Sequence, residues 1–295
     1  MDTSEIFKLL LSTHALEIAP LHQPFWYTSG TIGPFYLNGH FLYGNRQKAE
    51  ELLAFIDQHQ SDRRGLLLAL QGRVEKNYKE DAGYRAVIDS AVEIARTEIG
   101  AEQVDYVSGG ERRDWFFSLM VAQRLNKPAL ALFKEQSAFL LNNSQWQEIS
   151  ILTGAKILHV ADLVTEASSY TRTWLPALQK RGGELRWAIN IIDRGQGGEE
   201  ILKENGVAAV HLIQLGPAFF DRLQQSGYLD EATRQMLNAY HREPRESMKR
   251  LLEEHPEILR EALHSPEAKT RQRAQQMIKQ NPYEFSKEYL AAVQS

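Results

Sequence analysis

Apolar positions recur at two different spacings along the chain, and the spacing changes near residue 103. Before that point, stretches such as 46–57 and 86–100 carry apolar residues at helical intervals. The second stretch ends on Gly100, a residue suited to a helix C-cap. After residue 103, short apolar runs alternate with amphipathic stretches, which predicts strands joined by helices.

The alternating region predicts a parallel sheet, because strands separated by helical segments form right-handed βαβ units. Ligands of such sheets lie beyond the carboxyl ends of the strands, so chemistry is expected in the loops after Val107, Phe133, Val160 and Ile192. The predicted strands are 104–110, 128–133, 155–163, 185–194 and 208–215, and the helices between them include 114–125 and 169–183.

The two ends of the chain have a different texture. Residues 1–45 predict a short amphipathic helix and then an aromatic-rich stretch whose two glycine turns favour a β-hairpin. From residue 217 the pattern is helical and polar, and Ser265 followed by Pro266 predicts a helix start with Ser265 as N-cap. We therefore expect a hairpin hood at 1–45, an α/β core at 46–240 and a helical extension at 241–295.

Composition and charge narrow the function classes. A net charge of −4 without a basic cluster predicts no nucleic-acid partner. No run of about 18 apolar residues occurs, so no membrane partner is expected. The chain has no cysteine, which excludes disulfides and thiolate sites and fits a cytoplasmic location. Its histidines show no metal-ligand spacing, so no structural metal is predicted.

Five segments resemble, in the same order, motifs of the type I phosphoribosyltransferases, and of the orotate phosphoribosyltransferases in particular. The resemblance covers roughly residues 10–240. The segments are similar to the family's hairpin (FWYTSGTIGPFYLN, 25–38), pyrophosphate loop with its helix and strand (VSGGERRDW to FKE, 107–135), diphosphate-sugar motif (GAKILHVADLVTEASS, 154–169), D-R-x-x-G-G strand end (IIDRGQGG, 191–198) and C-terminal helices (AFFDRLQQSGYLDEATRQML, 218–237).

The diphosphate-sugar motif departs from the family pattern. Where the family has two adjacent acids for the ribose hydroxyls, this chain has Ala161 and Asp162. The family's T-T-G-G-S phosphate loop is replaced by residues 165–169, TEASS, without glycine. Glycine allows backbone amides to approach an anion closely. Glu166 is expected to repel the phosphate of the ligand, since like charges about 4 Å apart cost on the order of 1 to 4 kcal/mol.

The segment similar to the mobile catalytic loop is altered too. The family's R-K-E-x-K-x-H-G supplies cations that neutralise the pyrophosphate leaving group. In this chain Lys134 and Glu135 are retained, but Ser137 and Phe139 replace the second lysine and the histidine, and Thr28 replaces the hairpin lysine. These losses predict inefficient orotate transfer.

Arginines stand at the turn that resembles the pyrophosphate loop. Arg113 falls where the family carries a lysine before a glycine, and that glycine is Asp114. Arg112 and Arg113 can clamp a phosphate or carboxylate. The alternative is that both arginines pair with Glu111 and Asp114 on a solvated turn.

Other candidates each have two interpretations. Phe35 and Tyr36 either stack a planar ligand, as the family's aromatic pair does, or pack the hairpin. Asp193 and Arg194 either serve the ligand or form a structural ion pair. Asp162 either accepts hydrogen bonds from a sugar diol or caps the following helix.

The resemblance implies an α/β phosphoribosyltransferase type I fold: a parallel sheet flanked by helices, an N-terminal hairpin hood and a helical C-terminal extension. It implies a homodimer and a phosphorylated sugar or nucleotide as ligand, with Mg²⁺ if phosphoribosyl pyrophosphate is bound and a pyrimidine-like base as acceptor. Two alternatives stay open: a non-catalytic nucleotide or anion binder, or a scaffold acting through its helical tail. The implied catalytic residues are Lys134, Arg113 and Asp162, and the implied substrate-binding residues are Phe35, Tyr36, Arg112, Thr165, Ser168, Ser169 and Arg194.

Overall fold

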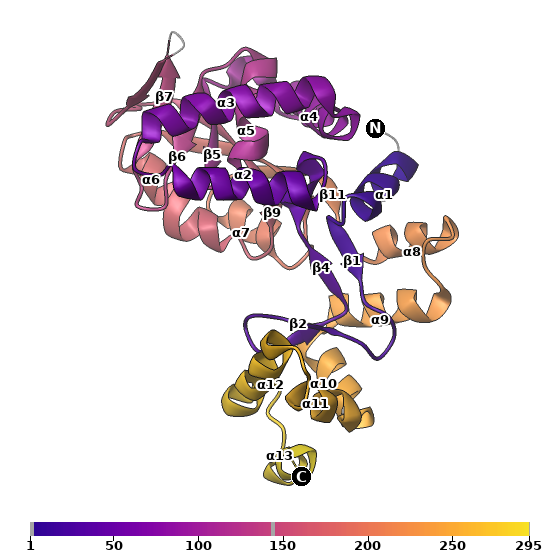
Figure 1. The fold of residues 1–295 in the computed structure, drawn as a ribbon. Helices are drawn as coiled ribbons and strands as arrows, with labels where there is room; N and C mark the ends of the chain where they lie inside the picture. The colour runs from indigo at the N-terminus through magenta and orange to yellow at the C-terminus, as the bar shows by residue number, and fades with distance from the viewer. Residues whose placement is uncertain (1–2, 143–144, 295) are drawn as a thin grey trace. The chain divides into compact units, whose positions relative to one another are not determined.

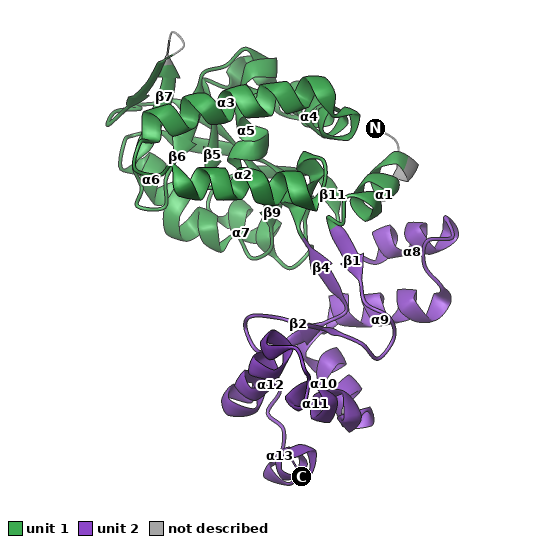
Figure 2. Cartoon of the chain, viewed as in Figure 1, with its two compact units in different colours: residues 1–15, 38–215 green, residues 16–37, 216–295 purple. Residues whose placement is uncertain are grey.

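The structure, a computed structural model, describes residues 3–142 and 145–294. It divides into two compact units (Figures 1 and 2). Unit 1 comprises residues 1–15 and 38–215, and unit 2 comprises residues 16–37 and 216–295. Residues 16–37, which hold the first part of the aromatic-rich stretch, thus belong to the same unit as the C-terminal helices. The domain boundaries that the sequence predicted, at residues 45 and 240, stay predictions.

Unit 1 is built on a seven-stranded sheet of order β11-β10-β9-β5-β6-β7-β8. Its first five strands in that order run parallel, as the sequence predicted. The strands are β5 (Tyr106–Gly110), β6 (Ala129–Leu132), β7 (Ala138–Asn142), β8 (Gln145–Glu148), β9 (Lys156–Val164), β10 (Glu184–Asp193) and β11 (Ala208–Gln214).

The sequence prediction missed β7 and β8, which extend the sheet as antiparallel strands. Leu140 of β7 pairs with Leu130 of β6, and the intervening turn is closed by a 3.0 Å hydrogen bond from the Phe133 amide to the Ser137 carbonyl. The resemblance indicated a catalytic loop here. In this chain the apolar run that follows the turn is long enough to pair with β6 instead.

Helices of unit 1 cover the sheet. Helices α3, α4 and α5 contact one another, and α5 lies against β5, β6 and β9 (Figure 1). No helix among the described residues is both long and apolar enough to span a membrane. The helical elements are α1 (Thr3–Ser12), η1 (Gly39–Tyr43), α2 (Arg46–Gln58), α3 (Arg63–Glu80), α4 (Ala82–Ile94), η2 (Ala95–Ile99), η3 (Ala101–Gln103), α5 (Trp115–Leu125), η4 (Tyr170–Trp174), α6 (Leu175–Gln179) and α7 (Gly198–Glu204). Gly100 ends η2 with a φ of 79°, as expected of a C-cap glycine.

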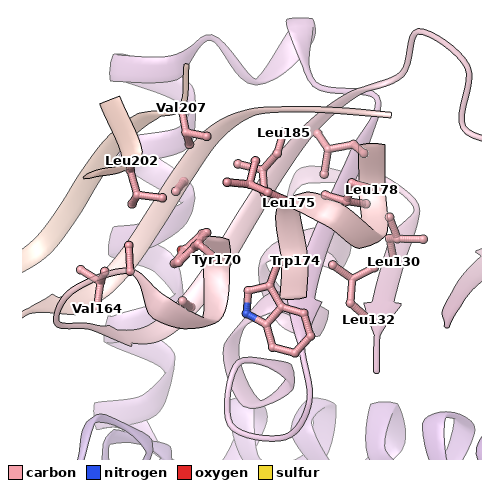
Figure 3. Packing of buried hydrophobic residues seen from close by; sticks show 14 of the residues in the cluster. Leu130, Leu132, Val164, Tyr170, Trp174, Leu175, Leu178, Leu185, Leu202 and Val207 are labelled. Carbon is pink, nitrogen blue, oxygen red and sulfur yellow. The ribbon is translucent and has the colours of Figure 1, made fainter. Parts of the chain in front are cut away.

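A buried apolar cluster fixes the segment that follows residues 165–169. Tyr170 and Trp174 of η4 pack with Leu175 and Leu178 of α6 and with side chains from the sheet (Figure 3). Each large apolar side chain that is fully buried contributes about 1.5 to 3 kcal/mol. The loop before η4 is therefore held by a core that resists displacement.

Unit 2 combines two short strand pairs with helices. The β2–β3 pair forms the predicted hairpin, and the buried amide of Ile32 donates to the Tyr283 hydroxyl at 2.9 Å. Helix α12 begins at Ala268 with Glu267 as its N-cap, so the prediction of Ser265 as N-cap was wrong. The elements are β1 (Leu16–Ile18), β2 (Phe25–Trp26), β3 (Ile32–Gly33), β4 (Phe35–Leu37), α8 (Pro217–Gln225), α9 (Glu231–Arg242), α10 (Pro244–Glu254), α11 (Pro256–Leu263), α12 (Ala268–Gln280) and α13 (Lys287–Gln294).

Candidate functional site

A cavity of about 440 Å³ lies in unit 1, where β5, β6 and β9 end. It brings together seven of the predicted site residues: Lys134, Arg112, Arg113, Asp162, Thr165, Ser168 and Ser169. The remaining lining residues are Glu111, Asp114, Ala161, Leu163, Val164, Glu166, Ala167, Tyr170 and Trp174. The site therefore lies where a parallel sheet is expected to bind a ligand.

The turn between β5 and α5 carries the first group of lining residues. Arg112 forms an ion pair with Asp57 of α2. Glu111 accepts hydrogen bonds from the Gln60 amide at 2.9 Å and from the Lys134 backbone N–H at 3.0 Å. The prediction that both arginines pair within the turn was wrong, because Arg112 finds its partner on another helix.

Two cations of the cavity are exposed and have no ion pair within residues 3–142 and 145–294. They are Arg113, on the turn before α5, and Lys134, directly after β6. Glu135 does not neutralise Lys134, since its carboxylate pairs with Arg63 at 2.5 Å. A free guanidinium and a free ammonium in one cavity favour an anionic ligand.

The catalytic-loop substitutions lie in ordered structure. Ser137 donates to Glu135 at 2.7 Å and accepts from Arg63 at 2.8 Å, while Phe139 is buried on β7 against the Phe133 ring. Lys134 is thus the cation that this segment contributes to the cavity.

Asp162 lies at the floor of the cavity within β9, where it is 7% exposed. The strand continues to Val164, so the alternative that Asp162 caps the next helix was wrong. Burial, together with the neighbouring carboxylate of Asp114, raises the pKa of Asp162 to about 8. His40 of η1 lies 4.0 Å from this carboxyl, and burial with the charges of Arg113 and Arg112 lowers the pKa of His40 to about 3.

Asp114 connects the two sides of the cavity. Its carboxylate accepts hydrogen bonds from the Gly110 amide at 3.0 Å and from the Asp162 amide at 3.1 Å. It also lies 3.3 Å from Nε2 of the buried His159, whose Nδ1 lies 2.9 Å from the Ser108 hydroxyl. Sequence reasoning missed this network, because its members are far apart along the chain.

Trp174 is a further lining residue that the sequence did not identify. A side chain at position 110 would collide with its indole, so the turn approaches Trp174 closely only because residue 110 is glycine. The indole of Trp174 and the turn after β5 are therefore in close contact.

The loop 165–169 keeps the backbone shape of a glycine-containing loop. Ala167 is buried and has a φ of 48°, in the left-handed region that favours glycine. Thr165, Ser168 and Ser169 offer hydroxyls to the cavity, and Glu166 is exposed on its rim. The loop can therefore supply hydroxyl donors to an anion, with Glu166 opposing the anion's charge.

Three predicted residues are not among those lining the cavity. Phe35 is buried in unit 2, with its ring centroid 5.5 Å from that of Tyr240. Tyr36 donates from its hydroxyl to the Trp26 carbonyl at 2.7 Å. Arg194 follows β10 and donates its amide to the Val164 carbonyl at 3.0 Å.

Groups of metal-ligand type also occur away from the cavity. Asp193, Glu199 and His211 each bring one ligand atom within 4.8 Å of the others. The Asp193 carboxylate already accepts from the Gly195 amide at 2.8 Å, so part of its capacity serves the end of β10.

No family model matches the chain, but known orotate phosphoribosyltransferases are similar to it in sequence. The orotate phosphoribosyltransferase of Methanothermobacter thermautotrophicus is 29% identical over 173 residues, 58% of this chain and 92% of that protein. The orotate phosphoribosyltransferase of Rhizobium rhizogenes is 31% identical over 109 residues, 37% of this chain and 43% of that protein.

Solved structures show the same fold. The orotate phosphoribosyltransferase of Francisella tularensis matches with a TM-score of 0.50 at 14% identity, over 80% of this chain and 97% of that one. The UMP synthase of Leishmania donovani matches with a TM-score of 0.55 at 14% identity, over 82% of this chain and 42% of that one. At this identity the structural matches establish the fold alone.

Proposed function

Because this chain is an orotate phosphoribosyltransferase-like protein with the type I phosphoribosyltransferase fold, we propose that its cavity binds a phosphorylated ribose, either as phosphoribosyl pyrophosphate or as a nucleotide. The observation that carries the proposal is the pair of free cations, Arg113 and Lys134, beside the retained Asp162. Such a set recognises an anion attached to a polyhydroxylated group.

The residues predicted from the sequence have the following roles in this proposal. Arg113 and Lys134 hold the diphosphate or another anionic group. Thr165, Ser168 and Ser169 donate hydroxyl hydrogen bonds to the 5-phosphate. Arg112 lines the cavity and contributes less than Arg113, because Asp57 already pairs with it, and Arg194 supports the loop through its backbone hydrogen bond.

In the transfer reaction, a nitrogen of a pyrimidine-like base would attack the anomeric carbon as its bond to pyrophosphate breaks. The leaving pyrophosphate takes the electron pair, and its developing charge must be stabilised by nearby cations. Arg113 and Lys134 supply that charge, while Ser137 and Phe139 supply none. We therefore expect slow transfer at most.

Mg²⁺ is expected only as the complex that it forms with phosphoribosyl pyrophosphate. The residues do not fit a metal held by the protein itself, because Ala161 replaces one acid and Asp162 is buried with a raised pKa. Hard divalent cations prefer ionised oxygen ligands. No step of the reaction above depends on an Mg²⁺ ligand from the chain.

A second candidate function is non-catalytic binding of the same class of ligand for regulation. Ser137 and Phe139 favour it, because the cations that they replace would stabilise the leaving pyrophosphate, and their loss weakens transfer more than binding. We also propose that the protein is cytoplasmic and that it forms a homodimer. Light scattering of the purified protein would test the homodimer by its mass.

The experiment is titration calorimetry with phosphoribosyl pyrophosphate and Mg²⁺, with and without orotate, followed by an assay for orotidylate. Binding together with orotidylate formation, both reduced in Arg113→Gln, would support transfer. Binding without product would support the regulatory alternative. Absence of binding at millimolar ligand would refute both.

A further inference from the structure

Three side chains of metal-ligand type meet beside β11, the strand at one edge of the sheet, and none of them lines the cavity. Asp193 ends β10, His211 lies on the neighbouring β11, and Glu199 is in the first turn of α7. Each brings one ligand atom within 4.8 Å of the other two, and no second group of this kind occurs among residues 3–142 and 145–294. Histidine spacing in the sequence did not indicate this group, because only one histidine takes part.

Asp193 is the buried member of the group, and its carboxylate is only partly satisfied. The residue is 1% exposed. Oδ1 accepts from the Gly195 amide at 2.8 Å, whereas the hydrogen bond that Oδ2 accepts from Nε2 of Gln214 is 3.4 Å long. An ionised carboxylate has about four acceptor positions, so about two remain open. A buried carboxylate of this kind is normally paired with a cation or bound to a metal.

The chain supplies no lysine or arginine to this group within the part that the structure describes. The ion-pair partner of Asp193 there is Nδ1 of His211, which lies 3.9 Å from Oδ2, too far for a hydrogen bond. Glu199 forms no side-chain ion pair or hydrogen bond with the described residues, although it lies beside the other two. Two carboxylates and an imidazole are thus gathered without a cation from the protein.

We propose that Asp193, Glu199 and His211 bind one divalent transition-metal ion, with Zn²⁺ as the representative. Two carboxylate oxygens and one imidazole nitrogen fill three positions of a tetrahedral site and leave the fourth for water. The imidazole favours Zn²⁺ over Mg²⁺ and Ca²⁺, which prefer oxygen ligands alone. Ligand atoms about 2.1 Å from Zn²⁺ lie about 3.4 Å apart, so a small rotation of the solvent-accessible Glu199 and His211 side chains closes the group.

The hydrogen bond to Oδ1 of Asp193 suits a ligand role. Carboxylates that bind a metal are themselves held by hydrogen bonds, which fix their orientation. The Gly195 amide does this from the turn 194–198, where Gly195 has a φ of 68°. The same turn leads directly into α7 and Glu199. One short segment therefore orients the buried ligand and delivers the second.

A metal here braces the end of β9, from which the loop 165–169 begins. The Arg194 amide donates to the Val164 carbonyl at 3.0 Å. A side chain at position 198 would collide with the Thr165 carbonyl oxygen, so the turn packs tightly against this strand end. Because the ion joins the turn to β11, its role is structural. The site does not depend on the ligand of the cavity, and the inference goes beyond the proposed function.

The test is titration calorimetry of Zn²⁺ into the purified chain freed of any affinity tag, with the bound metal counted by elemental analysis. We expect one tightly bound ion per chain and much weaker binding of Mg²⁺. Glu199→Gln and His211→Ala should each weaken zinc binding by more than about 10- to 100-fold, the cost of losing an outer hydrogen-bond partner alone. The controls Glu200→Gln, on the same helix, and His59→Ala, on the surface, should bind as the wild type does.

Two further measurements separate a built site from adventitious zinc. In a long-range ¹H–¹⁵N spectrum, the ring nitrogens of His211 should shift on addition of Zn²⁺. The melting temperature should rise with Zn²⁺ in the wild type and not in Glu199→Gln or His211→Ala, because an ion that binds only the folded chain stabilises it.

Three results would overturn the inference: no zinc binding, zinc binding of equal strength in both ligand variants, or a shift at another histidine in place of His211. Each of them leaves the proposed function intact, since ribose 5-phosphate is titrated separately and its cavity contains none of these three residues.

Discussion

Replacing Asp162 by asparagine should stabilise the protein at neutral and alkaline pH. Asparagine has nearly the shape of the protonated acid but carries no charge at any pH. The raised pKa of Asp162 means that ionising it costs more in the folded chain than in the unfolded chain. Asp162→Asn removes that cost.

The magnitude follows from the pKa. A rise from 3.8 to about 8 is about four decades of proton affinity, which corresponds to at most about 6 kcal/mol at 1.36 kcal/mol per decade. We expect a few kcal/mol in practice, because the protein relaxes around a buried charge.

The sign depends on pH. The folded state binds the proton more tightly, so wild-type stability is unaffected below pH 4 and is lost progressively as the pH rises to 8. The variant should therefore match the wild type near pH 4, gain on it through pH 8, and keep a constant advantage above pH 8.

Urea unfolding of wild type and variant at pH 4, 6, 8 and 9, followed by circular dichroism, measures the difference. Glu166→Gln is the matched control, since it removes an exposed carboxylate from the same cavity and should show no comparable gain with pH. An Asp162→Asn protein that is less stable than wild type at pH 8, or whose difference does not change with pH, would refute the reasoning.

Four further predictions follow from the cavity. Arg113→Gln should weaken ribose 5-phosphate binding by about 10- to 100-fold in calorimetry, as expected for one charge-assisted contact, whereas Arg112→Gln should weaken it less because Asp57 already pairs with Arg112; equal effects would contradict the assignment. Glu166→Gln should strengthen binding of the same dianion by about tenfold at low salt, and no change would place Glu166 away from the anion. Ala167→Gly should raise the free energy of unfolding in urea by up to about 1 kcal/mol, since glycine suits a φ of 48°; a lower free energy of unfolding would count against strain there. Tyr170→Phe should lower stability by about 1 to 3 kcal/mol, because Oδ1 of the buried Asn190 loses its donor; an unchanged midpoint would show that this hydrogen bond adds nothing.

The parallel part of the sheet was predictable from the sequence, and the added strands were not. Buried strands such as β9 and β10 are long apolar runs between helical segments, a pattern that identifies them directly. β8 is an edge strand with only Trp146 buried, and β7 follows a turn that resembled a catalytic loop. The local sequence therefore indicated these two strands only weakly, and the resemblance predicted a loop in their place.

Much of the cavity was predictable because its residues follow successive strands. Arg113, Lys134 and Asp162 were brought together by the ends of β5, β6 and β9, as the topology requires. The partners of these residues were not predictable. Asp57 and His40 are far from them in sequence, and nothing local indicates that α2 and η1 approach the site.

The role of Asp114 was also hidden in the sequence. At this position the family pattern has glycine, so the sequence indicated only that a glycine of a solvated turn had been replaced. In the fold its carboxylate joins the turn after β5 to the strand that carries Asp162. Only the spatial arrangement shows that the substitution added contacts.

The most direct test of the account is titration calorimetry of ribose 5-phosphate into the wild type, Arg113→Gln and the double variant Arg113→Gln/Lys134→Gln at pH 7. The account predicts binding to the wild type, weaker binding to the single variant and no measurable binding to the double variant, with unchanged circular dichroism. Equal affinity in all three proteins, or no binding to the wild type at millimolar ligand, would contradict a phosphoribosyl site in this cavity.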